Sequence, residues 1–156
     1  MEDQEVDARH AFTARVSLYW ESVGFPRAVG AILGHLMVCE PAAQTQAEIA
    51  TTLGLSTGSV STQLKSLLSI GLVEPVRRPG ERALRYQLPQ DVWAGVVKSE
   101  MERMVGLREL ADAGADVVPV TRPDRIAGLA VVMDFFEAEW PRLMDRFDEH
   151  LRKERS

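Results

Sequence analysis

Apolar residues recur at steps of three and four in several parts of the chain, which is the spacing of one face of an α-helix. The first such part is residues 6–23. Gly24-Phe25-Pro26 ends this helix, and Pro26 opens a second one, because the first helical position needs no amide proton. Glu40-Pro41 ends the second helix, since the residue before proline avoids helical angles.

Two short helices joined by a tight turn are predicted next. Thr45 is expected to cap a helix from Gln46 to about Leu53, with Glu48 as its partner in a capping box. Gly54 allows the turn, and Ser56 or Thr57 caps a helix that runs to about Ile70. We expect Gly71 to end it.

After Gly71 the apolar residues no longer recur at helical spacing, and the pattern predicts a β-hairpin. Residues 72–76 and 83–88 read as two short strands, and the turn between them, residues 77–82, is rich in arginine. Pro75 indicates that the first strand lies at a sheet edge.

Residues 91–115 and 123–152 are predicted to form two long helices. In the second, apolar residues alternate steps of three and four, as in the seam of a coiled coil: Ile126, Leu129, Met133, Phe136, Trp140, Leu143 and Phe147. Pro141 lies inside this helix, so we expect a kink or a short break there. The fold class is therefore mainly α with a small β-hairpin.

Composition narrows the function classes. The chain has 156 residues, of which 46% are hydrophobic and 26% charged, as in a globular domain with helical extensions. No apolar run reaches the ~18 residues of a membrane span, and the acidic N-terminus is unlike a secretory signal. With the single cysteine Cys39, this favours a cytoplasmic protein.

Enzyme signatures are absent from the sequence. It has no phosphate-binding glycine-rich loop, no Gly-x-Ser-x-Gly and no His-Glu-x-x-His. We therefore expect no enzymatic activity, no cofactor and no metal.

The charge distribution points to a nucleic-acid partner although the net charge is −5. Residues 44–88 hold five basic and three acidic residues, whereas the rest of the chain holds 13 basic and 20 acidic residues. A basic segment within an acidic chain provides local positive charge, which is typical of a surface that binds nucleic acid.

The order helix, turn, helix, hairpin also fits double-stranded DNA by geometry. A helix enters the major groove if its outward side chains are short or form hydrogen bonds, and arginines on an adjacent hairpin can bind phosphates or a minor groove. The candidate DNA-binding residues are Thr45, Thr57, Ser59, Ser61, Thr62, Lys65, Arg77, Arg78 and Arg82. Ser56 is expected to serve as a helix cap instead.

These motifs carry a family resemblance. The stretch Leu53-Gly54-Leu55-Ser56, followed by Val60-Ser61, Gly71-Leu72-Val73 and Arg77-Arg78-Pro79-Gly80, resembles the winged helix-turn-helix of MarR-type transcriptional regulators. The segments around Gly24-Phe25-Pro26 and Phe135-Phe136-Glu137 are similar to the GbsR-like branch of that family. Glu81-Arg82 stands where such wings often carry Asp-Arg.

The resemblance implies a homodimeric regulator, most simply a repressor, that binds a pseudo-palindromic operator and responds to a small-molecule effector. It divides the chain into an N-terminal dimerisation helix (residues 1–24), a winged helix-turn-helix (25–89) and C-terminal dimerisation helices (90–156). The dimerisation candidates are Phe12, Ile126, Leu129, Met133, Phe136, Trp140, Leu143 and Phe147. Trp20, Trp93 and Phe135 are candidates for an effector pocket.

Alternative interpretations stay open. The winged helix could contact a protein, or the chain could sense a ligand without binding DNA. The seam could be buried inside the monomer, and the aromatic residues could simply be core. His35 and Cys39 lie four residues apart, which would suit a metal pair or a redox thiol, but a buried cysteine is the simpler interpretation.

Overall fold

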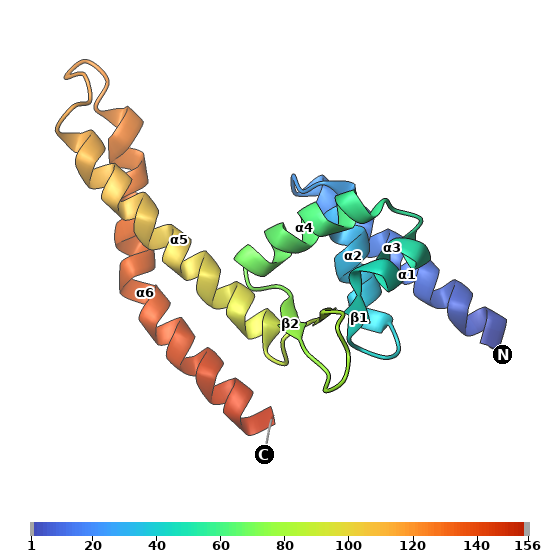
Figure 1. The fold of residues 1–156 in the computed structure, drawn as a ribbon. Coiled ribbons are helices and arrows are strands. Elements are labelled where there is room, and N and C mark those ends of the chain that lie inside the picture. Colours follow the sequence, from blue (N-terminus) through green and yellow to red (C-terminus); the bar gives the residue numbers. More distant parts are fainter. Residues whose placement is uncertain (1, 155–156) are drawn as a thin grey trace. The chain divides into compact units, whose positions relative to one another are not determined.

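A computed structural model of the chain describes residues 2–154, except the side chains of residues 2, 3 and 105. The chain forms two compact units, Met1–Val96 and Val97–Ser156. Each unit is described by itself (Figure 1).

The first unit holds four helices and a small sheet. The helices are α1 (Glu2–Ser22), α2 (Arg27–Val38), α3 (Gln46–Leu53) and α4 (Thr57–Ser69). All four were predicted, and α1 begins four residues earlier than the apolar pattern indicated.

The sheet has three antiparallel strands in the order β1 (Gln44–Thr45), β3 (Arg85–Gln87), β2 (Glu74–Val76). The hairpin of β2 and β3 was predicted, although both strands are shorter than expected. Pro75 faces Tyr86 and lies on an edge strand, which confirms the expectation from its missing amide proton. Strand β1 was not predicted, because two residues carry no readable alternation.

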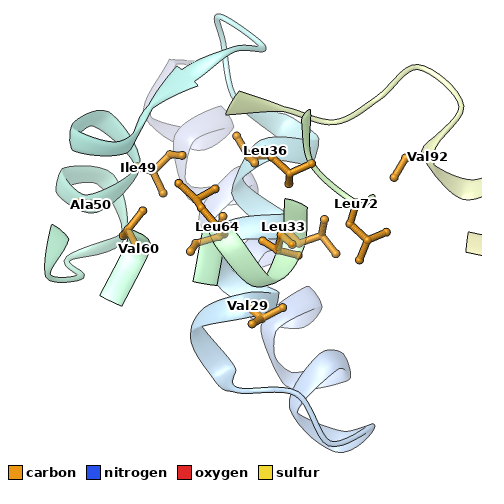
Figure 2. Packing of buried hydrophobic residues seen from close by; sticks show 12 residues of the cluster. Val29, Leu33, Leu36, Ile49, Ala50, Val60, Leu64, Leu72 and Val92 are labelled. Carbon is orange, nitrogen blue, oxygen red and sulfur yellow. The ribbon is translucent and has the colours of Figure 1, made fainter. Parts of the chain in front are cut away.

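The core of this unit joins three helices. Val29 and Leu33 of α2, Ile49 of α3 and Val60 and Leu64 of α4 are at most 2% exposed and point toward one another (Figure 2). Leu72, Val73 and Val92 close the same cluster. Burial of this apolar stripe leaves the polar side of α4 turned outward.

Helices α1 and α2 approach each other very closely. A Cβ atom on Gly30 would lie 2.7 Å from the Cα of Ser17, and one on Gly34 would lie 3.0 Å from the Cα of Thr13. The Ser17 hydroxyl also donates a hydrogen bond to the carbonyl oxygen of Arg27, at 2.9 Å. The α1–α2 contact therefore depends on two glycines and a buried hydroxyl.

The second unit consists of α6 (Asp124–Glu154) and most of α5 (Val92–Ala115), which lie side by side. Both helices were predicted within two residues of their ends. Of the kink or short break expected at Pro141, the break does not occur, because α6 continues through this residue. A proline inside a helix removes one backbone hydrogen bond. Here the packing of the long helix α6 outweighs the loss of that bond.

The apolar seam of α6 is partly used inside this helical hairpin. Met133 is 3% exposed, and Ile126, Leu129, Phe136, Trp140 and Phe147 are half-buried. Ile126 packs against Gly114 of α5, where an added Cβ atom would lie 2.9 Å from the Ile126 side chain. Leu143, at 50% exposed, faces away from this contact.

Candidate nucleic-acid interface

The turn between α3 and α4 is fixed by side-chain caps. The Glu48 amide donates to the Thr45 hydroxyl at 3.2 Å, and the Thr45 amide donates to the Glu48 carboxylate at 2.7 Å. This is the predicted capping box. Gly54 has a φ of 62°, the left-handed conformation that lets α3 end in a tight turn.

Ser56 then caps α4, where its hydroxyl accepts a hydrogen bond from the Ser59 amide at 3.1 Å. Of the two predicted caps, Ser56 is therefore the one used. The Gln46 side chain also donates to the carbonyl oxygen of Thr57, at 2.8 Å. The first turns of α3 and α4 are thus tied together, which holds the orientation of α4.

The outward face of α4 carries the predicted groove-reading residues. Thr57, Thr62 and Lys65 are exposed, and Ser59 and Ser61 are half-buried. The Thr62 hydroxyl donates to the carbonyl oxygen of Gly58, at 3.0 Å, so its free lone pairs can only accept. This face presents small polar groups and one ammonium group.

Thr45 is placed differently from the other candidates. It is half-buried, and its hydroxyl is engaged in the capping box of α3. The structure thus gives Thr45 a role in the turn, and any contact with DNA would have to leave that hydrogen bond intact.

The loop between β2 and β3 extends away from the helices (Figure 1) and carries three arginines. Arg77, Arg78 and Arg82 are exposed, and within residues 2–154 none of them forms an ion pair. Gly80 has a φ of 83°, and the Glu81 amide donates to the Arg78 carbonyl oxygen at 3.1 Å, which closes the loop as a turn. Three free guanidinium groups are therefore available for an anionic partner.

Arg85 of β3 is a structural link at the candidate interface that the sequence reasoning missed. Its guanidinium lies 2.7 Å from Glu81 and 3.0 Å from Glu48, and it donates to the Ala43 carbonyl oxygen at 3.1 Å. The hydrogen bond to Glu81 raises the pKa of Arg85, and the charges of both carboxylates raise it further. Arg85 thus ties the wing to the start of α3.

The aromatic pocket candidates do not share one environment. Trp20 is half-buried and stacks edge-on against Phe25, with ring centroids 4.8 Å apart. Trp93 and Phe135 are 49% and 63% exposed. Phe135 lines an open groove on α6 together with Trp140 and Leu143.

The His35 and Cys39 pair gives no sign of a metal or redox site. Cys39 follows the end of α2, and burial raises the pKa of its thiol, which disfavours the reactive thiolate. Burial lowers the pKa of His35, and the nearby His10 lowers it further. Among the described residues, no three potential ligand residues gather around one point.

No helix within residues 2–154 is both long and apolar enough to cross a membrane.

Comparisons with known proteins agree with this geometry. A model described as "MmpR5-like MarR family transcriptional regulator" matches residues 91–150, and a "MarR family" model matches residues 23–83. The HTH-type transcriptional regulator MmpR5 of Mycobacterium tuberculosis (strain ATCC 25618 / H37Rv) is 31% identical over 123 residues, which cover 79% of this chain and 74% of that protein.

A crystal structure of a transcriptional regulator superimposes with a TM-score of 0.79 at 27% identity. The match covers 91% of this chain and 99% of the other. The helix-turn-helix and the long C-terminal helices both fall within matched regions.

Proposed function

Because this chain belongs to the MarR family of winged-helix transcriptional regulators, which bind DNA and are not enzymes, we propose that it represses transcription as a homodimer on a pseudo-palindromic operator. The observation that carries the proposal is the pairing of a polar α4 face with three unpaired arginines on the wing of the same unit. Occlusion of a promoter by the bound dimer would be the mechanism.

The α4 face would read bases in the major groove. Ser59, Ser61 and Thr62 are short enough to allow close approach of the helix, and their hydroxyl groups can bond to base edges or phosphates. Thr57 and Lys65 flank them, and the Lys65 ammonium group has no carboxylate partner within residues 2–154. We assign sequence preference to the three central hydroxyls and affinity to Lys65.

The wing would bind the DNA backbone. Arg77, Arg78 and Arg82 are free to release counterions from phosphates or to enter a minor groove, because no acidic side chain neutralises them within the described part of the chain. This contribution is independent of sequence and sensitive to salt.

Dimerisation would use the apolar residues that the α5–α6 hairpin leaves uncovered. On α6, Val131, Phe135 and Leu143 are each at least half exposed, and on α1 Phe12 is 37% exposed. Val131 and Phe135 lie four residues apart and so share one face of α6, and apolar residues that gather on an exposed face are typical of an interface. A two-fold pair would place two recognition helices in half-sites roughly 34 Å apart, which turns two weak contacts into one strong one.

Two finer assignments also belong to the proposal. The segments around Pro26 and Phe136 support the GbsR-like branch, and a small-molecule effector would act by changing how the two recognition helices fit their half-sites. Operator binding would place the protein in the cytoplasm.

The test is selection of bound sequences from a random double-stranded DNA pool, followed by gel shifts at low and moderate salt. Recovery of an inverted repeat with a centre-to-centre spacing near one helical turn is expected. Binding that is equal on all duplexes would overturn the operator assignment. No binding at low salt would leave a winged helix that contacts a protein instead.

A further inference from the structure

We propose that Gly58 sets how closely α4 approaches the base edges in the major groove, and so determines how well the protein distinguishes its operator from other DNA. This inference rests on the role proposed above for α4, and it adds a residue whose contribution is the absence of a side chain. Gly58 is exposed and is the second residue of α4.

The fold itself does not require a glycine at position 58. Gly58 lies inside a helix and its φ is not positive, so other residues can adopt its backbone conformation. A Cβ atom added to Gly58 would meet no heavy atom within 4 Å from elsewhere in the described part of the chain. Because glycine loses more conformational freedom in a helix than alanine does, alanine here would make the folded state more stable. The missing side chain is therefore useful only where α4 meets a partner.

Gly58 lies on the polar face of α4. Thr62 and Lys65 follow it at helical steps of four and three residues, and both are exposed. Val60 and Leu64, which are at most 2% exposed, belong to the opposite, buried face. The Thr62 hydroxyl donates a hydrogen bond to the Gly58 carbonyl oxygen, so the two residues are neighbours on the outward face. A base that Thr62 contacts would therefore lie close to Gly58 as well.

A side chain at position 58 would hold α4 away from the bases. The recognition helix of a helix-turn-helix contacts base edges with its N-terminal residues, and Gly58 lies in the first turn of α4. The carbon of an added methyl group lies about 1.5 Å from the Cα atom. Hydrogen-bond distances, in contrast, vary by only about 0.5 Å. A methyl group between α4 and the groove would therefore move the Thr62 hydroxyl out of hydrogen-bonding range of a base.

The same methyl group should matter little on random DNA. Non-specific binding depends on cations that neutralise phosphates, which Lys65 and the wing arginines would supply. Phosphate contacts do not require the close approach that hydrogen bonds to base edges require. Gly58 thus contributes to specificity more than to overall affinity.

The experiment compares the wild type, Gly58→Ala and Gly95→Ala as full chains, on the selected operator and on a random duplex at one salt concentration. Gly95 is the matched control, because it is also an exposed helical glycine of the first unit at which an added Cβ atom meets nothing within 4 Å. We expect both changes to raise the urea midpoint of unfolding. Gly58→Ala should weaken operator binding about tenfold and change binding to the random duplex by less than about twofold. Gly95→Ala should change neither affinity.

Wild-type operator affinity in Gly58→Ala would overturn the inference. A lower urea midpoint would also overturn it, because the fold would then need the glycine. An equal loss on both duplexes would contradict it as well, since position 58 would then lie against the phosphate backbone. A wild-type protein that does not distinguish the two duplexes would overturn the operator assignment and this inference with it. The wild-type measurement therefore separates a failure of the proposed function from a failure of the role of Gly58.

Discussion

The Arg85 guanidinium lies 3.0 Å from the carboxylate of Glu48, and this ion pair connects the central strand of the wing to the first turn of α3. Glu48 already accepts a hydrogen bond from the Thr45 amide, which lowers the pKa of its carboxyl, and Arg85 lowers that pKa further. One carboxylate therefore serves both the cap of α3 and the attachment of the wing.

Arg85 and Arg82 should behave differently although both are wing arginines. The Arg85 side chain is 13% exposed and held by two carboxylates, so it is a positioning residue and not a phosphate contact. We expect Arg85→Ala to weaken operator binding by loosening the wing while the dependence of log K on log salt keeps its slope. Arg82→Ala should reduce that slope by about one.

Gel shifts over a series of salt concentrations measure both slopes. Arg125→Ala on α6 is the control, because it removes an exposed charge that lies outside the wing. Equal changes of slope for Arg82→Ala and Arg85→Ala would contradict the distinction between the two.

Thr62 should determine base preference more than overall affinity. Its hydroxyl donates to the carbonyl oxygen of Gly58, which leaves an acceptor for a base amino group. We expect Thr62→Val to change discrimination at one operator position by roughly 1–3 kcal/mol. Competition between operators that differ at single positions measures this, and a uniform loss on every sequence would assign Thr62 to backbone positioning.

Leu143→Asp should split the dimer without unfolding the monomer. Leu143 is 50% exposed, so a carboxylate there remains hydrated in the monomer but would be buried in a paired interface. Sedimentation velocity at micromolar concentration should show a monomer with unchanged helix content by circular dichroism. Glu139→Asp, on the same helix, is the control that keeps the charge and the dimer. A dimeric Leu143→Asp protein would place the interface elsewhere.

Local signals were enough to predict most of the fold. The capping box at Thr45, the turn glycine Gly54 and the edge proline Pro75 each act within a few residues, and the structure confirms all three. Strand β1 was missed because it exists only through pairing with β3, about 40 residues away in sequence. The short break that Pro141 suggested does not occur, because the packing of a long helix outweighs the hydrogen bond that proline removes.

The site was less predictable than the fold. Exposure on α4 follows from helical period, so Thr57, Thr62 and Lys65 could be placed from the sequence. The pairing of Arg85 with Glu48 could not, because it joins residues 37 positions apart through the sheet. Which apolar residues of α6 pack against α5 and which stay exposed also depends on the direction from which α5 approaches.

His35 should make the first unit less stable in mild acid. Its Nε2 atom is buried and has no hydrogen-bond partner within the described residues, and burial lowers its pKa. The unfolded imidazole takes up a proton near about pH 6.5, before the folded one does, so the free energy of unfolding falls as the pH drops below that value. Above about pH 6.5 the imidazole is neutral in both the folded and the unfolded state, so the free energy of unfolding keeps its full value.

Urea unfolding at pH 7.5 and 5.5 should therefore show a smaller loss of stability for His35→Gln than for the wild type. His150→Gln, an exposed histidine change on α6, is the matched control and should retain the wild-type loss. The same pH dependence in His35→Gln would mean that other groups cause it.

Gly30 should be the most sensitive position of the α1–α2 contact. A methyl group there would lie 2.7 Å from the Cα of Ser17 and 2.9 Å from the Cβ of Trp20, and the first of these atoms is backbone that cannot turn aside. We expect Gly30→Ala to lower the free energy of unfolding by about 1–3 kcal/mol, as overpacking does. Gly95→Ala, in α5 of the same unit, meets no atom within 4 Å and should raise it by up to about 1 kcal/mol. Because both changes add one methyl group to a helix, an equal effect in denaturant titration would show that α1 does not pack against α2 in solution.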